Sequence, residues 1–325
     1  MRPRQLVKAA AGFASAKLWG RRIPLAVGWD VTHRCNLRCL YCGFERLDPG
    51  ELDTARALEL IDAMADAGCV RLHLSGGEPM LRDDIGELIG RVLQRGMACA
   101  LNTNGFRIDS RIDQVRHVDA IRLSYDGPRE VHDQLRGQGA HAQMLAALEA
   151  ARDAGTRVVL NATLNARNVG MLDELLAFAA AQRTPIKFQP VVPGLAYGKG
   201  LDGLEPEQPQ LEAAVRRLLL LKARNRLIVN SRANLDYYLQ RPDPGALPCV
   251  AGKLYTRVDP LGRLYPCSMM RREPLMRDAL QLGFRRAFED LPAVRCSDCI
   301  CPPTLELNML YDLNLRSLLN LRKYL

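Results

Sequence analysis

A chain of 325 residues, 48% hydrophobic and 25% charged, is long enough for one large domain, or a large and a small one, around a substantial core. This composition excludes disordered and collagen-like proteins, and the apolar runs are too short for a membrane span. Because no signal peptide opens the chain, we expect a cytoplasmic protein whose clustered cysteines are metal ligands rather than disulfides.

The N-terminal segment, residues 1–24, is basic and lacks acidic side chains, although the net charge of the whole chain is only +9. Residues 5–19 have the pattern of an amphipathic helix. We expect this helix to pack on the body of the protein, with a membrane surface or an acidic partner as candidate contacts. No zinc-finger, helix-turn-helix or aromatic–basic pattern supports nucleic acid as a partner.

Residues 25–209 alternate between strand and helix patterns, which predicts a parallel sheet with crossover helices. The predicted strands are 25–31, 70–75, 98–103, 120–124, 157–164 and 186–192. The predicted helices are 54–67, 83–95, 141–154 and 168–181. Six such units fall short of the eight that close a full barrel. The predicted fold is therefore α/β, an open partial (β/α)6 barrel of the TIM type.

The remainder of the chain has a different character. Residues 193–209 are rich in Gly and Pro, and 210–248 are expected to form connecting helices. Five of the ten cysteines then fall between Cys249 and Cys301. We expect a small C-terminal iron-sulfur module over residues 249–304, followed by a C-terminal helix over 305–325.

Three thiols, those of Cys35, Cys39 and Cys42, stand on one short stretch directly after the first predicted strand. A 4Fe-4S cluster normally takes four cysteine ligands, so three leave one iron with an open position. An open position is what separates a catalytic from a structural metal site. The alternative is a zinc ion that takes a fourth ligand from elsewhere, such as His33.

The spacing Cys-x3-Cys-x2-Cys, with Tyr41 before the last cysteine, resembles the signature of the radical S-adenosylmethionine (SAM) superfamily. Gly76-Gly77-Glu78-Pro79, after the second predicted strand, resembles the GGEP motif of that family. The resemblance implies a partial barrel whose cluster binds the amino and carboxylate groups of SAM. A flavodoxin or ferredoxin-type donor would supply the electron that cleaves SAM to a 5'-deoxyadenosyl radical, which abstracts hydrogen from a substrate carbon.

The same resemblance implies a set of SAM-binding residues near the ends of the strands. Glycines let the main chain approach a ligand closely, and a carboxylate pairs with an ammonium group. Tyr41 would lie against the adenine. The two glycines alone would otherwise indicate an ordinary tight turn, and the polar residues at the later strand ends are alternatively turn caps. The implied SAM-binding residues are Tyr41, Gly76, Gly77, Glu78, Pro79, Asn104, Ser124 and Asn161.

The second cysteine set resembles the twitch module, the shortened relative of the SPASM domain. Asp259-Pro260-Leu261-Gly262 predicts a hairpin turn between two of these cysteines. Four thiolates would fully ligate an auxiliary 4Fe-4S cluster, although a zinc site of four cysteines is the alternative. Cys69 and Cys99 are expected in the core. The predicted auxiliary ligands are Cys249, Cys267, Cys296 and Cys299.

The leading functional hypothesis is dehydrogenation or epimerisation of a small natural-product or sugar-type metabolite. Maturation of a ribosomally made peptide is the alternative, and a non-catalytic iron-sulfur electron carrier or sensor is a third. An electron carrier needs neither the GGEP-type motif nor an open iron. We favour oxidation over epimerisation, because four cluster ligands are available without Cys301. A free Cys301 thiol would instead be a hydrogen donor for epimerisation.

Overall fold

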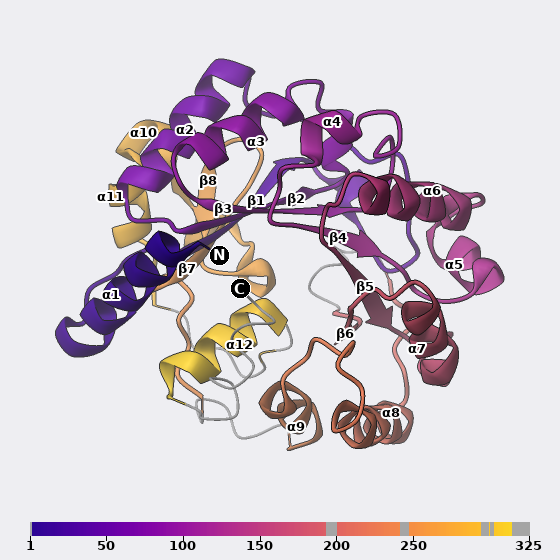
Figure 1. The fold of residues 1–325 in the computed structure, drawn as a ribbon. Coiled ribbons are helices and arrows are strands. Elements are labelled where there is room, and N and C mark those ends of the chain that lie inside the picture. The colour runs from indigo at the N-terminus through magenta and orange to yellow at the C-terminus, as the bar shows by residue number, and fades with distance from the viewer. Residues whose placement is uncertain (1, 193–199, 241–246, 294–298, 300–301, 314–325) are drawn as a thin grey trace.

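The computed structural model describes residues 2–192, 200–240, 247–293, 299 and 302–313. Its centre is a nine-stranded sheet in the order β6-β5-β4-β3-β2-β1-β7-β8-β9 (Figure 1). Neighbouring strands from β1 to β6 all pair in parallel, so each connection must cross over on a helix. The predicted α/β partial barrel is confirmed.

The six barrel strands agree with the predicted ones to within two residues at each end. Their bounds are β1 Ala26–Thr32, β2 Arg71–Gly76, β3 Ala98–Thr103, β4 Ala120–Ser124, β5 Val158–Leu164 and β6 Ile186–Pro190. The helices that follow them cover the outer face of the sheet (Figure 1). These are α2 Thr54–Asp66, α3 Ile85–Gln94, α4 Ile112–Val115, α5 Arg129–Arg136, α6 Ala140–Asp153 and α7 Leu172–Ala181. The sequence patterns missed the short helices α4 and α5.

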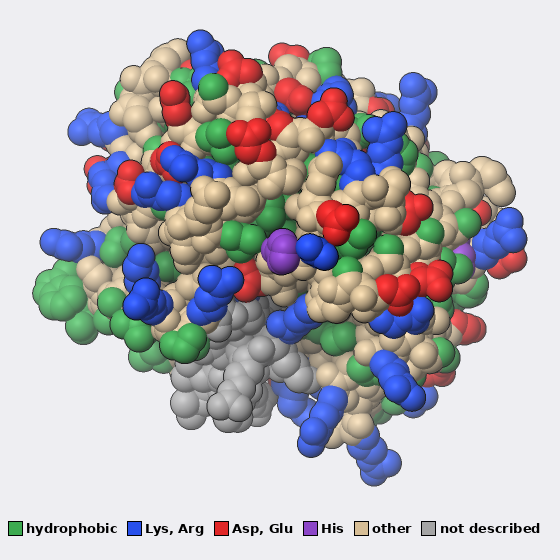
Figure 2. Space-filling model, turned by 45° about the horizontal axis from the view of Figure 1, so that its top comes forward, with side chains coloured by type: hydrophobic (Ala, Val, Ile, Leu, Met, Phe, Trp, Pro, Cys, Tyr) green, Lys and Arg blue, Asp and Glu red, His purple; other side chains and the backbone are tan. Residues whose placement is uncertain are grey.

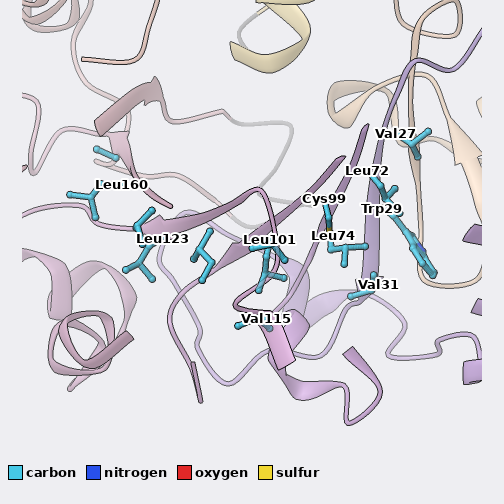
Figure 3. Packing of buried hydrophobic residues seen from close by; sticks show 14 of the residues in the cluster. Val27, Trp29, Val31, Leu72, Leu74, Cys99, Leu101, Val115, Leu123 and Leu160 are labelled. Carbon is cyan, nitrogen blue, oxygen red and sulfur yellow. The ribbon is translucent and has the colours of Figure 1, made fainter. Parts of the chain in front are cut away.

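Alternation along the strands separates the core from the lumen of the barrel. On β2, Leu72 and Leu74 are fully buried in the main hydrophobic cluster, together with outward-facing residues of the neighbouring strands (Figure 3). His73 and Ser75 point the other way and line a cavity. Since successive side chains of a strand face opposite sides, this pattern places polar residues inside the barrel.

The C-terminal part extends the same sheet. Strand β7 (Tyr255–Val258) pairs in parallel with β1, and β8 (Arg263–Tyr265) returns antiparallel to it. The predicted hairpin turn is present: the Gly262 N–H donates to the Asp259 carbonyl at 3.0 Å. The remaining elements are α8 Gln208–Lys222, α9 Arg232–Gln240, β9 Arg277–Asp278, α10 Ala279–Leu282, α11 Phe284–Glu289 and α12 Pro302–Tyr311.

The predicted basic helix forms as α1, Pro3–Trp19, and protrudes from the body (Figure 1). One side is anchored, because Ala16 is fully buried and the Gln5 amide donates to the Gly96 carbonyl at 3.1 Å. Elsewhere on the helix, Val7, Leu18 and Trp19 are 69 to 71% exposed. In the space-filling view, hydrophobic and cationic side chains lie next to one another at the left, the side on which α1 protrudes (Figure 2). Among the described helices, none is long and apolar enough to cross a membrane.

Candidate active site

The cysteine loop follows β1 at the edge where the parallel strands end. The thiols of Cys35, Cys39 and Cys42 all line one cavity of about 270 Å³. The Leu40 N–H donates to the Leu135 carbonyl at 2.8 Å, which fixes the middle of the loop against the end of α5. Active sites of barrel enzymes lie at this edge, where loops from several strands meet.

The donor set fits an iron-sulfur cluster. Burial raises the pKa of the Cys35 thiol to about 12 and that of Cys42 to about 11. A bound metal centre would favour the thiolate form of both residues near neutral pH, because thiolates are the metal ligands. In the described part of the chain, no three His, Cys, Asp or Glu side chains converge on the position of one metal ion. A 4Fe-4S cluster does not need that convergence, since its cysteines bind different irons. Three cysteine thiols that line one cavity are a donor set that fits a 4Fe-4S cluster with one open iron.

Gly76 and Gly77 line the cavity, but their main contact is with the backbone that leads into the cysteine loop. The Gly77 N–H donates to the Thr32 carbonyl at 2.8 Å. A Cβ on Gly77 would lie 2.2 Å from the Arg34 carbonyl oxygen, and one on Gly76 2.1 Å from that of Thr32. Neither position has room for a side chain. The glycines therefore allow two strand ends to touch just before Cys35.

Glu78 lies behind the cavity wall. Its side chain is fully buried and accepts hydrogen bonds from the Met80 N–H (3.0 Å), the Thr103 hydroxyl (2.9 Å) and the Asn104 N–H (2.8 Å). Burial raises its pKa to about 7, although these hydrogen bonds oppose the rise. The carboxylate thus accepts hydrogen bonds from three protein donors, and its pairing with a ligand ammonium group stays a prediction. Pro79 is also buried and begins the short 3-10 helix η2, Pro79–Leu81.

Asn104, Ser124 and Asn161 all line the cavity. The Asn104 side-chain amide donates to the side-chain oxygen of Asn36 at 2.9 Å and lies 4.0 Å from the Cys35 sulfur. Hydrogen bonds to cluster sulfurs tune reduction potentials, so Asn104 is well placed for that role. Ser124 and Asn161 are direct partners in the register of β4 and β5. Three of the predicted SAM-binding residues thus meet at one end of the cavity.

Tyr41 is tied to the barrel by a buried carboxylate. Its hydroxyl donates to Asp126, which also accepts from Arg136 Nε at 2.7 Å and from the Thr163 N–H at 2.8 Å. Burial opposes ionisation of Asp126, but Arg136 and the hydrogen bonds outweigh it and lower its pKa. Asp126 therefore joins the cysteine loop, α5 and β5. The Arg136 guanidinium also stands 5.5 Å from the centre of the Tyr41 ring.

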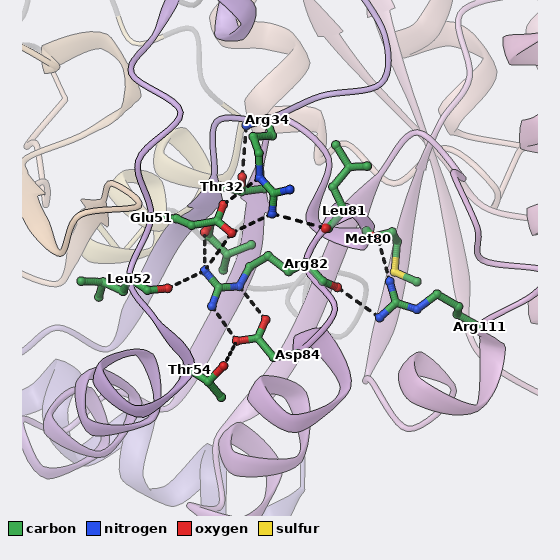
Figure 4. Close-up of polar contacts among 11 residues, drawn as sticks. Thr32, Arg34, Glu51, Leu52, Thr54, Met80, Leu81, Arg82, Asp84 and Arg111 are labelled. Atoms are coloured by element: carbon green, nitrogen blue, oxygen red, sulfur yellow. Dashed lines mark hydrogen bonds and ion pairs between the residues drawn. The ribbon is translucent and has the colours of Figure 1, made fainter.

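A second buried network fixes the entrance of the cysteine loop (Figure 4). The Arg82 guanidinium, 3% exposed, donates to the carbonyls of Val31 (3.2 Å) and Leu52 (3.0 Å) and pairs with Asp84 at 2.6 Å. Arg34, next to Cys35, donates to Glu51 at 2.7 Å and to the Leu81 carbonyl at 3.3 Å. These two arginines hold together the end of β1, the segment before α2 and η2.

The second cysteine set is described only in part. Cys249 is exposed, Cys267 is buried and Cys299 is half-buried, whereas Cys296 and Cys301 lie outside the described residues. Asn308, 1% exposed, connects two parts of this set. Its amide donates to the Cys299 sulfur at 3.5 Å, and its oxygen accepts from the Val250 N–H at 2.9 Å. Asn308 thus brings Val250, the neighbour of Cys249, close to Cys299.

The sequence patterns missed the cationic lining of the cavity. His73, Arg122, Lys187 and Arg257 all line it, from β2, β4, β6 and β7. The signal was present for three of them, since His73, Arg122 and Lys187 stand between hydrophobic residues, as in Leu72-His73-Leu74. In a barrel, such alternation places the polar side chain in the lumen.

The open parallel barrel and the three-cysteine loop at its strand ends define an iron-sulfur barrel enzyme. The chain belongs to the radical SAM superfamily, whose profile, described as "Radical SAM superfamily", matches residues 29–179. This family uses a 4Fe-4S cluster together with SAM. Relatives of the SPASM type carry auxiliary clusters as well.

Comparison with known proteins supports this assignment. The chain is 32% identical over 261 residues to the PqqA peptide cyclase of Granulibacter bethesdensis, covering 75% of this chain and 67% of that protein. It is 27% identical over 290 residues to the mycofactocin maturase MftC of Mycobacterium ulcerans, covering 85% of this chain and 77% of that protein. Its fold resembles that of Streptococcus suis SuiB bound to S-adenosylmethionine, with a TM-score of 0.69, 15% identity, and coverage of 88% of this chain and 71% of SuiB.

Proposed function

We propose that this radical SAM enzyme modifies a peptide by abstracting hydrogen from one of its carbons. The observation that carries the proposal is the similarity to the PqqA peptide cyclase, which extends over 75% of the chain. The similarity to the maturase MftC points the same way. The relatives thus favour the peptide over the small metabolite that the sequence alone placed first.

The residues of the chain have distinct parts in this proposal. Cys35, Cys39 and Cys42 would hold the cluster that supplies the electron for SAM cleavage. Asn104 would orient the cysteine loop, while Ser124 and Asn161 would bind the nucleoside of SAM. The surrounding barrel wall would keep water and competing hydrogen donors away from the substrate carbon. A flavodoxin or ferredoxin-type donor remains part of the proposal, because SAM cleavage needs an external electron.

The test uses anaerobically reconstituted full-length enzyme, SAM, a reductant and short peptides encoded beside the gene. We expect one peptide to stimulate release of 5'-deoxyadenosine and to change in mass. A matched set of candidate small metabolites, chosen from the enzymes encoded in the same gene neighbourhood, serves as the comparison. Stimulation by a metabolite and by none of the peptides would contradict the proposal.

Within this proposal we retain oxidation rather than epimerisation as the outcome. The reaction run in deuterated water would give a product two hydrogen atoms lighter if the substrate is oxidised. Deuterium at the abstracted carbon, lost in Cys301→Ala, would show epimerisation with Cys301 as the hydrogen donor. Cys249, Cys267, Cys296 and Cys299 remain the proposed auxiliary ligands.

We also propose that α1 contacts an anionic membrane surface. Its exposed residues include the apolar Val7, Leu18 and Trp19 and the cationic Lys8, and the helix carries no acidic residue. Co-sedimentation with vesicles containing anionic lipid should fall in the variant Leu18→Ser/Trp19→Ser. Equal binding of this variant and the wild type would contradict the contact.

A further inference from the structure

His33, which stands two residues before Cys35, is buried and uses both of its ring nitrogens. Its side chain is 2% exposed. Nδ1 lies 2.6 Å from the Asp48 carbonyl oxygen, and Nε2 lies 3.3 Å from Nη2 of Arg271. A guanidinium only donates hydrogen bonds and a carbonyl oxygen only accepts them, so the ring donates through Nδ1–H and accepts at Nε2. His33 thus connects Arg271 with the backbone at Asp48.

The His33 ring holds together the two ends of the cysteine loop. The ring stands at the entrance of the loop, whereas Asp48 lies in the segment 43–51 that leaves it. Phe44 belongs to the same segment, lines the cavity, and packs on the ring with 5.7 Å between the ring centres. One side chain therefore contacts the leaving segment at two places, at Phe44 and at Asp48.

Arg271 comes from the C-terminal part of the chain. It directly follows the short 3-10 helix η4, Ser268–Met270. Its side chain is 13% exposed and stands 3.8 Å from the Asp259 carboxylate, which also pairs with Arg263 at 2.7 Å. The guanidinium is thus held beside the turn of the β7–β8 hairpin while it donates to His33.

A backbone contact brings the same hairpin to the cysteine loop. The Leu52 N–H, just after the segment 43–51, donates to the Pro260 carbonyl in the hairpin turn at 2.9 Å. Ser268, which follows Cys267, lines the same cavity as the thiols of the loop. The C-terminal part of the chain therefore lies against the loop and against the cavity.

We propose that Arg271 is a positioning residue for SAM binding and that it acts through His33. The hydrogen bond from Arg271 fixes the orientation of the ring, and the ring fixes both ends of the loop that carries Cys35, Cys39 and Cys42. Groups that hold the ligands of a metal centre set the affinity at that centre, because they orient the ligands. The part of the chain that carries the second cysteine set thereby completes the SAM site of the barrel.

The test measures SAM affinity by calorimetry on the anaerobically reconstituted full-length enzyme. Arg271→Met keeps an aliphatic stem but removes the donor to His33, while Asp259 keeps Arg263 as its partner. His33→Asn places an amide nitrogen near the position of Nδ1, so it can still donate to Asp48, but its side chain ends there and does not reach Arg271. Each variant should bind SAM about tenfold more weakly than the wild type.

The double variant shows whether the two residues act together. Because Arg271 acts through His33, the double variant should bind SAM about as weakly as either single variant, rather than about a hundredfold more weakly than the wild type. The control Arg272→Met changes the exposed neighbouring arginine and should bind SAM like the wild type. Iron content should be unchanged in all variants. The change that SAM causes in the EPR spectrum of the reduced cluster should need about tenfold more SAM in the two single variants.

Wild-type SAM affinity in Arg271→Met would overturn the inference, and so would single effects that multiply in the double variant. Loss of iron in Arg271→Met would assign this residue to the folding of its own region and would overturn the inference as well. None of these measurements uses a substrate, so their results do not depend on the proposed peptide.

Discussion

At the residue scale, Gly77 decides how closely the second strand end approaches the cysteine loop. The sequence predicted that the glycines serve close contact with a ligand. That role stays a prediction, and their missing side chains also allow the backbone at 76–77 to touch that of residues 32–34. A motif can reveal that glycine is required at a position without revealing which neighbour requires it, since either a ligand or a backbone would exclude Cβ.

We predict that Gly77→Ala destabilises the protein and lowers its iron content. The new methyl group would overlap the Arg34 carbonyl, and relief of such overpacking costs about 1–3 kcal/mol. The control is Gly90→Ala, in α3, where a Cβ meets nothing within 4 Å. Because alanine is the better helix former, this control should gain about 0.5–1 kcal/mol. Equal melting temperatures and iron contents for the two variants would contradict the packing role of Gly77.

For Glu78 we predict a loss of stability as well as weaker SAM binding. In Glu78→Gln, the amide oxygen can keep the Met80 and Thr103 contacts, but the amide nitrogen would face the Asn104 N–H. Two opposed donors leave one buried group unsatisfied, at a cost of about 1–3 kcal/mol. Chemical unfolding, with exposed Glu149→Gln as control, measures this. Weaker SAM binding at unchanged stability would show instead that the carboxylate contacts the ligand.

At the scale of elements, Arg82 joins three segments, which are the end of β1, the residues before α2 and those before α3. We predict that Arg82→Met lowers the unfolding free energy by about 3–5 kcal/mol, because Asp84 and two carbonyls lose a buried partner (Figure 4). The surface pair Arg56–Asp53, 63% and 66% exposed, provides the control Arg56→Met, expected to cost about 0–1 kcal/mol. A similar small effect for both would contradict the structural role of Arg82.

The main elements were predictable because strands and crossover helices have distinct hydrophobic periods. The helices α4 and α5 were missed, since α4 spans four residues and α5 is strongly polar, with only His132, Leu135 and Arg136 buried. Strand β7 was not expected to pair with β1, because the sequence pattern of a hairpin does not show which edge it joins. The lumen cations are spread over four strands, and only the barrel brings them together.

At the scale of the molecule, one cavity connects the cysteine loop, the proposed SAM residues and the cationic lining. The sheet that surrounds it continues into the hairpin before Cys267, so the region of the second cysteine set is joined to the barrel by β1–β7 pairing. Two 4Fe-4S clusters would give about eight irons per chain after reconstitution. Zinc bound at the second set instead would contradict the auxiliary cluster.

The central claim is that Cys35, Cys39 and Cys42 support the cleavage of SAM. The most direct measurement is release of 5'-deoxyadenosine by the reduced, reconstituted enzyme, with iron counted in the same sample. The variant with all three replaced by Ala should release none and lose about half its iron. The control Cys69→Ala/Cys99→Ala changes two buried core thiols, and it should keep both its iron and its release of 5'-deoxyadenosine. Continued release of 5'-deoxyadenosine by the triple variant would contradict the account.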